Sequence, residues 1–161
     1  MEGDDIDRPL RKGDGTPDLR DAGAHALSAR CFCGAAVLRL AAPAQGVVHC
    51  HYGQCRRLSG AAFTTWASFA HRTVDVITGE ALAAFKATSN VTRHFCKFCG
   101  SHVFTSDARH PKLVGVPAGI VEGPRPASTA HYFVSHKAAW YAINDGLPQF
   151  GGGSGFAKLE E

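Results

Sequence analysis

Two tight cysteine pairs, each closed by a glycine, constrain this chain more than any other feature. The first pair is Cys31 and Cys33, followed by Gly34, and the second is Cys96 and Cys99, followed by Gly100. Each turn presents two thiolates to one point in space, which is half of a tetrahedral zinc site. A zinc ion bound by all four would tie the two turns together and add its binding energy to folding. The spacing therefore predicts a closed, structural zinc site, and two unrelated pairs of buried thiols are the alternative.

The six cysteines of the chain are an even number, so they could form disulfides instead of binding metal. Which of the two is expected depends on whether the protein is in a reducing or an oxidising compartment. The chain starts with polar and acidic residues that do not resemble a signal peptide, and no stretch reaches the ~18 apolar residues of a membrane span. We therefore expect a cytoplasmic protein without a membrane partner. Thiols stay reduced in that compartment, which favours metal over disulfides. The net charge of +3 is too weak to predict nucleic acid as a partner.

Short apolar segments separated by glycine and proline make up most of the chain. They recur roughly every eight to twelve residues, as in all-β proteins. No long amphipathic helix is present to cross over between parallel strands, so an α/β fold is disfavoured. We predict an all-β, mainly antiparallel domain, with one short helical turn after Gln54 that ends at Gly60. A second helical turn is expected over residues 137–140. Trp66, Trp140 and Phe150 are expected in the core.

Composition divides the 161 residues into three parts. Residues 1–23 are rich in aspartate and arginine and poor in apolar residues, so we expect a flexible arm. Residues 24–150 carry the strands and the cysteines and form the zinc-binding domain. Residues 151–161 begin with Gly-Gly-Gly-Ser-Gly, which is typical of a flexible tail.

The remaining two cysteines, Cys50 and Cys55, form a second cluster. His49 and His51 flank Cys50, and Arg56 follows Cys55. Two cysteines alone are a poor metal site, but with a histidine or a water molecule they would hold a zinc ion of the catalytic type, with an open position. Two partly buried free thiols are an equally good interpretation of the spacing.

Several motifs in a fixed order resemble one family. Over residues 24–150 the sequence is similar to the glutathione-dependent formaldehyde-activating enzyme (GFA) family, which also includes centromere protein V (CENP-V). The matching pieces are Cys31-Phe32-Cys33-Gly34, Cys50-His51-Tyr52-Gly53-Gln54-Cys55-Arg56-Arg57 with Gly60, Arg93-His94-Phe95-Cys96-Lys97-Phe98-Cys99-Gly100-Ser101, Gly119, residues 126–131, Ser135-His136-Lys137-Ala138-Ala139-Trp140 and Asp145-Gly146-Leu147-Pro148-Gln149-Phe150.

This resemblance implies a β-tent fold of packed antiparallel sheets, related to methionine sulfoxide reductase B, with two zinc sites. The structural site maps onto the four cysteines Cys31, Cys33, Cys96 and Cys99. The second site, associated with the chemistry, uses a Cys-x-Cys-x-x-Cys motif whose outer ligands map onto Cys50 and Cys55. Its middle cysteine is Tyr52 here, and a phenol is a poor zinc ligand because its pKa is near ~10. The second site is then empty, completed by a histidine (His49, His51 or His94), or completed by a substrate thiol.

Two functions follow from the resemblance. The first is a carbon–sulfur lyase that joins glutathione, or another small thiol, to formaldehyde and so makes S-(hydroxymethyl)glutathione. Cys50 and Cys55 would hold the catalytic zinc that keeps the substrate sulfur as a thiolate. Arg56 or Arg57 would bind the carboxylates of glutathione, although a solvated surface pair is the simpler interpretation of these arginines. The second function is a non-enzymatic binding module, stabilised by the structural zinc alone.

Overall fold

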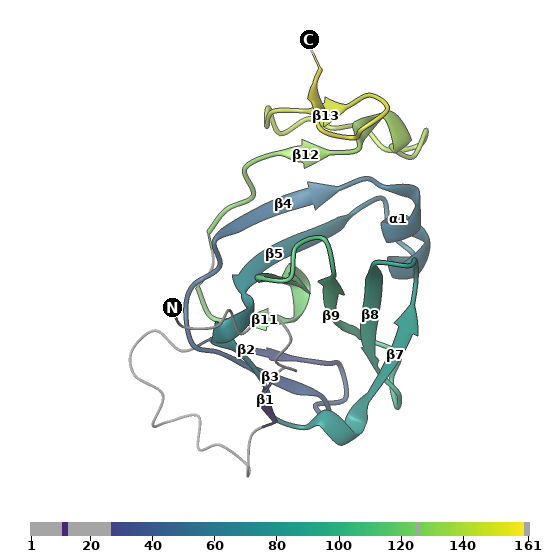
Figure 1. Ribbon diagram of the computed structural model, residues 1–161. Coiled ribbons are helices and arrows are strands. Elements are labelled where there is room, and N and C mark those ends of the chain that lie inside the picture. The colour runs from purple at the N-terminus through teal and green to yellow at the C-terminus, as the bar shows by residue number, and fades with distance from the viewer. Residues whose placement is uncertain (1–10, 13–26, 125, 160–161) are drawn as a thin grey trace. The chain divides into compact units, whose positions relative to one another are not determined.

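A computed structural model describes residues 11–12, 27–124 and 126–159 of the chain (Figure 1). In the first half, the strands are β1 (Arg11–Lys12), β2 (Leu27–Arg30), β3 (Val37–Leu40), β4 (Gly46–Cys50), β5 (Thr64–Ala70), β6 (Val74–Val76) and β7 (Leu82–Lys86). In the second half they are β8 (Val91–Cys96), β9 (His102–Asp107), β10 (Leu113–Pro117), β11 (Val121–Glu122), β12 (His131–Tyr132), β13 (Phe150–Gly151) and β14 (Ala157–Lys158).

One α-helix, α1 (Gly53–Ser59), interrupts the strands of the described chain. Four 3-10 turns accompany it, namely η1 (His71–Thr73), η2 (Gly79–Ala81), η3 (Ala118–Ile120) and η4 (Val134–His136). Most of the strand pairs are antiparallel, so the prediction of an all-β, mainly antiparallel fold is confirmed. None of the helices in the described ranges has the length and hydropathy that spanning a bilayer requires.

The chain forms two compact units. The first unit consists of residues 1–45 and 68–125, and the second of residues 46–67 and 126–161. Of the expected flexible arm, only Arg11–Lys12 lies within the described residues, where it pairs in parallel with β6. Strand β5 runs from the second unit into the first, since the boundary falls between Ala67 and Ser68.

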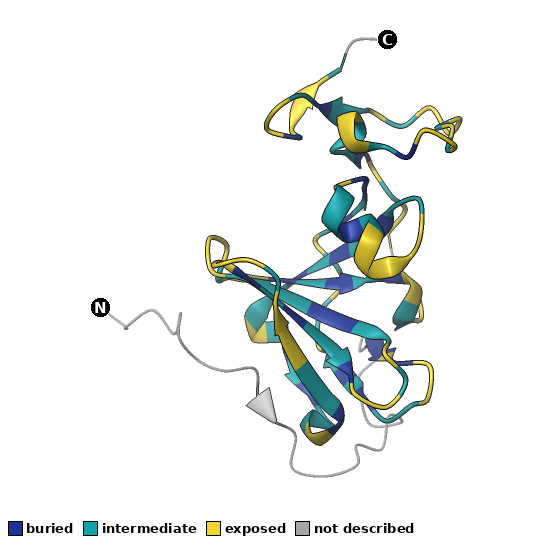
Figure 2. Cartoon of the chain, turned by 90° about the vertical axis from the view of Figure 1, so that its right-hand side faces the viewer, coloured by how far each residue is buried: buried dark blue, intermediate teal, exposed yellow. Residues whose placement is uncertain are grey.

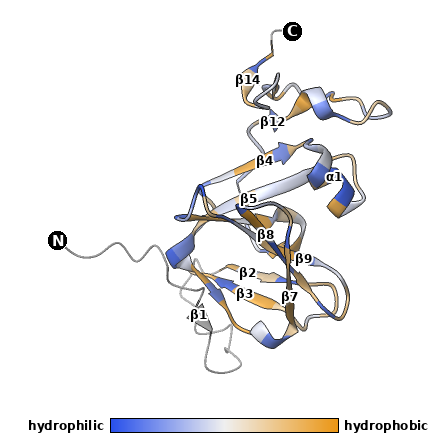
Figure 3. Ribbon diagram, turned by 45° about the vertical axis from the view of Figure 1, so that its right-hand side comes forward, coloured by the Kyte–Doolittle hydropathy of each residue, from blue (hydrophilic) through white to orange (hydrophobic). Residues whose placement is uncertain are grey.

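The first unit contains a five-stranded sheet with the order β1-β6-β3-β2-β11. Side chains alternate across a strand, and β3 follows this rule closely. Leu38 and Leu40 are fully buried, whereas Arg39 between them is not. Figure 2 colours the chain by burial and Figure 3 by hydropathy, and in Figure 3 both hydrophilic and hydrophobic stretches are visible along β2 and β3. Arg39 lies opposite Asp75 of β6 and donates to its carboxylate over 2.8 Å. The burial of each leucine stabilises the unit by roughly 1.5–3 kcal/mol.

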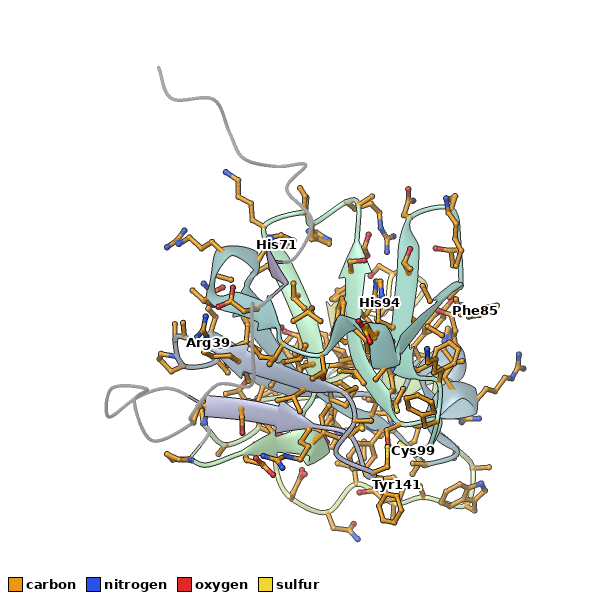
Figure 4. The ribbon with its side chains drawn as sticks, turned by 90° about the horizontal axis from the view of Figure 1, so that it is seen from below. Arg39, His71, Phe85, His94, Cys99 and Tyr141 are labelled. Atoms are coloured by element: carbon orange, nitrogen blue, oxygen red, sulfur yellow. The ribbon has the colours of Figure 1, made fainter. Side chains whose placement is uncertain are left out.

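The antiparallel strands β10-β9-β8-β7 form the other sheet region of this unit. His94 of β8 lies opposite Phe104 of β9, and their rings stack with centroids 4.0 Å apart (His94 is labelled in Figure 4). His102 of β9 makes a 2.9 Å hydrogen bond through Nε2 to the Thr105 hydroxyl. Burial is the main cause that lowers the pKa of His102 to about 4, aided by the nearby Arg93 and opposed by a hydrogen bond to the Phe104 carbonyl.

Acid should therefore destabilise the protein well above the pH at which carboxylates titrate. An unfolded histidine has a pKa near 6.5. Below that pH the histidine is therefore protonated in the unfolded chain, while His102 in the folded protein stays neutral until the pH approaches about 4. This contribution to the free energy of unfolding is fully present above pH ~6.5 and is lost as the pH falls towards about 4, by at most about 3 kcal/mol. Urea unfolding of wild type and His102→Gln across this range should show a flatter dependence in the variant. The exposed His110, changed to Gln, is the control, and an unchanged slope in His102→Gln would contradict the assignment.

The second unit holds β4, the first half of β5, α1 and β12. Strand β12 pairs with β4 in parallel, so that His131 lies opposite His49 and Tyr132 opposite Cys50. Helix α1 begins at Gly53, shortly after β4 ends at Cys50. It ends at Ser59 and is capped by Gly60, whose φ of 66° is in the left-handed region. The predicted helical segment that ends at Gly60 is thus present, and it is longer than the single turn expected.

The segment after β12 differs from expectation in two respects. The 3-10 turn η4 covers Val134–His136, and Lys137, with φ −55° and ψ 143°, leaves the helical region where a turn over 137–140 was predicted to begin. Trp140 is 75 % exposed and is not a core residue. Trp66 and Phe150 are intermediate in burial.

The glycine-rich stretch lies in a hairpin formed by β13 and β14, with Phe150 opposite Lys158. Phe133 adopts a left-handed φ of 57°, and its backbone N–H donates to the Gly155 carbonyl. A Cβ atom at Gly155 would lie 2.2 Å from the Phe133 ring, so no other residue fits there without a rearrangement. Composition alone predicts a tail at these positions, because it carries no information about this contact.

Candidate functional site

Four cysteines of the first unit converge at two turns. Cys31 and Cys33 follow β2, and Cys96 ends β8 with Cys99 in the next turn (Cys99 is labelled in Figure 4). The glycines that close the turns, Gly34 and Gly100, have φ values of 77° and 75°, which other residues rarely adopt. Their N–H groups donate back to the Cys31 and Cys96 carbonyls. The conformation of each turn thus explains why glycine follows each cysteine pair.

The sulfur atoms have the spacing of ligands on one metal ion. Cys31 Sγ lies 3.6 Å from Cys33 Sγ, which lies 3.7 Å from Cys96 Sγ. One ligand atom from each of the four cysteines lies within 4.8 Å of all the others. Zinc bound to sulfur at about 2.3 Å in a tetrahedron separates its ligands by roughly 3.8 Å. The four predicted ligands are therefore brought together, and their donor set fits a thiophilic metal.

The electrostatics of this cluster also favour a cation. Hydrogen bonds with Ser101 lower the pKa of the Cys99 thiol to about 5. The Ala35 backbone N–H works to lower the pKa of Cys33, but desolvation and the neighbouring sulfur atoms outweigh it and raise that pKa to about 12. Thiolates in contact repel one another, so they cannot all ionise without a compensating charge. A divalent metal would supply that charge.

The other predicted pair, Cys50 and Cys55, lies in the second unit. Cys50 ends β4 and Cys55 lies in α1, both are buried, and their sulfur atoms are 3.6 Å apart. Tyr52, at the N-cap of α1, is 37 % exposed and its ring packs against Phe133 and His136. The structure brings these two cysteines together at a distance that suits two ligands of one ion.

Within the described ranges, Cys50 and Cys55 do not form a potential metal-binding group with a third cysteine, histidine or carboxylate. For the two histidines nearest in sequence, strand alternation explains why they do not join this pair as ligands. His49 and His51 are two residues apart on either side of Cys50, so their side chains point to the face opposite that of the Cys50 thiol. This geometry disfavours the hypothesis that His49 or His51 replaces the missing thiolate.

Basic side chains lie in the same unit. Arg56 Nη1 donates to the His136 carbonyl over 2.8 Å, and Lys137 Nζ donates to the Tyr141 carbonyl over 2.6 Å. Arg57 is exposed. Burial lowers the pKa of His51, and together with the nearby His131, His49, Lys137 and Arg56 it brings that pKa to about 4. The neutral state of His51 follows from burial beside these positive groups.

A chain of polar side chains in hydrogen-bond contact lies in the same unit, and sequence reasoning did not identify it. His51 Nε2 lies 2.8 Å from His131 Nδ1, and His131 Nε2 lies 2.9 Å from Asp145 Oδ2. His51 and His131 are fully buried. His49 Nδ1 lies 2.9 Å from the Thr65 hydroxyl. The signal in the sequence was the alternation of His49 and His51 on a β-strand, but their partners lie far along the chain.

Comparisons with known proteins show which sequences and structures this chain is similar to. The profile of the family described as glutathione-dependent formaldehyde-activating enzyme matches residues 26–136. A protein of Halomonas elongata, named as a candidate glutathione-dependent formaldehyde-activating enzyme, is 29 % identical over 126 residues, which are 73 % of this chain and 80 % of that protein. A crystal structure of a Rhodobacter sphaeroides protein has a similar fold, with a TM-score of 0.50 and 22 % identity over 62 % of this chain and 91 % of that one. The chain belongs to the glutathione-dependent formaldehyde-activating enzyme family.

Proposed function

We propose that this protein is a zinc-dependent carbon–sulfur lyase that forms and cleaves the adduct of a small thiol, such as glutathione, with formaldehyde. The buried Cys50–Cys55 pair, with its sulfur atoms 3.6 Å apart, is the observation that carries this proposal. Family membership supports the choice of thiol and aldehyde. The four-cysteine site would hold a second zinc ion with a purely structural role, because four thiolates leave no open position.

The reaction needs no redox partner. In the forward direction the thiol loses its proton, its sulfur forms a bond to the formaldehyde carbon, and the former carbonyl oxygen takes up a proton. Cys50 and Cys55 would hold the zinc ion, which would supply a positive charge that stabilises the substrate thiolate and a Lewis acid for the aldehyde oxygen. Both cysteine side chains are buried, so the site limits the access of competing water.

Arg56 and Arg57 are proposed to bind the carboxylates of the thiol substrate. Arg56 is held by its hydrogen bond to the His136 carbonyl, and the guanidinium group has five N–H donors in all. Arg56 follows Cys55 in α1, and its charge contributes to the lowered pKa of His51 in the same unit. Glutathione carries two carboxylates, which match guanidinium groups in charge and geometry.

Exchange between formaldehyde and its glutathione adduct, followed by NMR with isotope-labelled formaldehyde, tests the proposal. Zinc-loaded wild type should accelerate the exchange over buffer, and Cys55→Ser should abolish the acceleration while leaving thermal stability nearly intact. Arg57→Gln should raise KM with little change in kcat, and exposed Arg72→Gln is the matched control that should change neither. No acceleration by zinc-loaded wild type would refute the proposal.

The substitution at Tyr52 favours a second candidate function. This phenol occupies the position of the middle cysteine in the family's Cys-x-Cys-x-x-Cys motif, and its ring packs against Phe133 and His136. A non-enzymatic binding module, with metal in the four-cysteine site alone, would have no need for that thiolate. This candidate predicts one zinc ion per chain bound by thiolates and no exchange activity, whereas the lyase predicts two such ions.

A further inference from the structure

We propose that His49, His131 and Asp145 form a metal site of a different kind, which binds one divalent first-row transition-metal ion through two imidazoles and a carboxylate. One ligand atom from each of the three residues lies within 4.8 Å of the other two. This site shares no ligand with the four-cysteine site or with the Cys50–Cys55 pair. It therefore stands or falls independently of the proposed lyase reaction.

The backbone fixes two of the ligands opposite each other. Strand β12 pairs in parallel with β4 so that His131 is the partner of His49. The His49 N–H donates to the Ala130 carbonyl, and the His131 N–H donates to the Pro148 carbonyl. The two rings lie on one side of the strand pair, with their centroids 4.8 Å apart. Backbone hydrogen bonds on both strands thus hold the histidines in place without any metal.

Hydrogen bonds also hold the carboxylate of Asp145 in place. Asp145 Oδ1 accepts the Leu147 N–H over 3.1 Å, and Oδ2 lies 2.9 Å from His131 Nε2. Two ligands at cis positions on an ion, each bound at about 2.1 Å, lie roughly 3 Å apart. The contact between Asp145 and His131 therefore already has the spacing of two ligands on one ion.

Each histidine also has the outer hydrogen bond that metal-binding histidines require. The ring nitrogen that does not bind metal almost always bonds to a neighbouring polar group, which fixes the ring orientation. For His131 that group is His51, whose Nε2 lies 2.8 Å from His131 Nδ1. For His49 it is the Thr65 hydroxyl, 2.9 Å from Nδ1, which leaves Nε2 for the metal. A purely structural Asp–His–His chain has no need for His49 beside it.

His51 supplies an independent observation. It is fully buried, and its Nδ1 has no hydrogen-bond partner among the described residues. Without metal, His131 Nε2–H donates to Asp145 and His51 Nε2–H donates to His131, so His51 Nδ1 is a buried lone pair. With metal on His131 Nε2, both rings switch tautomer, and His51 Nδ1 carries the proton instead. His51 can accommodate either state because Nδ1 is not committed to a partner.

The chemistry of the donors restricts the ion. Two neutral imidazoles and one carboxylate suit zinc, iron(II), cobalt or nickel, and they leave positions open for water or a substrate. The Asp145 side chain is 44 % exposed, which provides a path for the ion from solvent. The positive charge of the ion would be compensated in part by the Asp145 carboxylate.

Cobalt(II) is the probe that distinguishes this site from the thiolate sites. Thiolate-bound cobalt gives intense sulfur-to-metal charge-transfer absorption, whereas cobalt bound to nitrogen and oxygen does not. Metal-free full-length protein would be loaded with cobalt, and the cobalt content and charge-transfer absorption would be measured for wild type, His49→Asn, Asp145→Asn and the control His110→Asn. His49→Asn leaves the His51–His131–Asp145 chain intact, so its folding should be preserved.

We expect His49→Asn and Asp145→Asn each to bind one fewer cobalt ion per chain than wild type and the control. Their charge-transfer absorption should equal that of wild type and the control. Equal cobalt content in all four proteins would overturn the assignment. A loss of charge-transfer absorption in parallel with the cobalt content would place the missing ion in the thiolate sites and would also overturn it. The measurement does not involve turnover, so a failure of the lyase proposal leaves it unaffected.

Discussion

Cys96→Ser should release the metal from the four-cysteine site and lower the free energy of unfolding by more than about 4 kcal/mol. Cys96 is fully buried, and its sulfur lies 3.7 Å from that of Cys33, which belongs to the other turn of the site. Loss of this ligand removes the link between the turn after β2 and the turn after β8. Urea unfolding with and without a strong zinc chelator measures the effect.

The chelator separates the loss of metal from the cost of a buried hydroxyl. Wild type should lose stability when the chelator is added, whereas Cys96→Ser should already have lost it and respond little. Cys55→Ser changes a thiol that is also buried but lies outside this cluster, and it should retain the full chelator response. A chelator response in Cys96→Ser as large as that of wild type would show that Cys96 does not bind the stabilising metal.

The four-cysteine site was predictable because its signal is mostly local. Each pair fits a tight turn by its own spacing, and the glycines that follow, at φ values of 77° and 75°, are needed by those turns. Joining the pairs required only the rule that zinc takes four ligands. The strands could be located for a similar reason, since alternation within β3 or β8 is visible in a few consecutive residues.

The histidine–aspartate cluster was not predictable, because it depends on a long-range pairing. Strand β12 has two residues, too few for a recognisable alternation, and its parallel partner β4 lies far upstream. Asp145 reaches His131 from a segment without regular structure. The exposure of Trp140 was not predictable from the sequence either. Its size predicts burial, but the extended backbone at Lys137 ends the turn before it, and the ring is 75 % exposed.

Tyr52→Cys should raise the zinc affinity of the Cys50–Cys55 pair by at least about 100-fold, because changes in outer-sphere partners alone alter metal affinity by about 10–100-fold and a thiolate ligand contributes more. Tyr52 lies between the two cysteines in sequence, at the N-cap of α1. Removing its ring loses the contacts with Phe133 and His136, whose centroids lie 5.0 and 5.6 Å away, at a cost of roughly 1 kcal/mol. Chelator competition and cobalt charge-transfer absorption would measure the gain.

Tyr52→Ser is the matched control, since it removes the same ring without supplying a thiolate. It should lose the same stability as Tyr52→Cys and gain no metal. If Tyr52→Cys binds more zinc and accelerates the formaldehyde–glutathione exchange beyond wild type, the lyase site is present and limited only by its third ligand. If both variants bind metal equally, the Cys50–Cys55 pair is not the remnant of a three-thiolate site, and the lyase proposal loses the observation on which it rests.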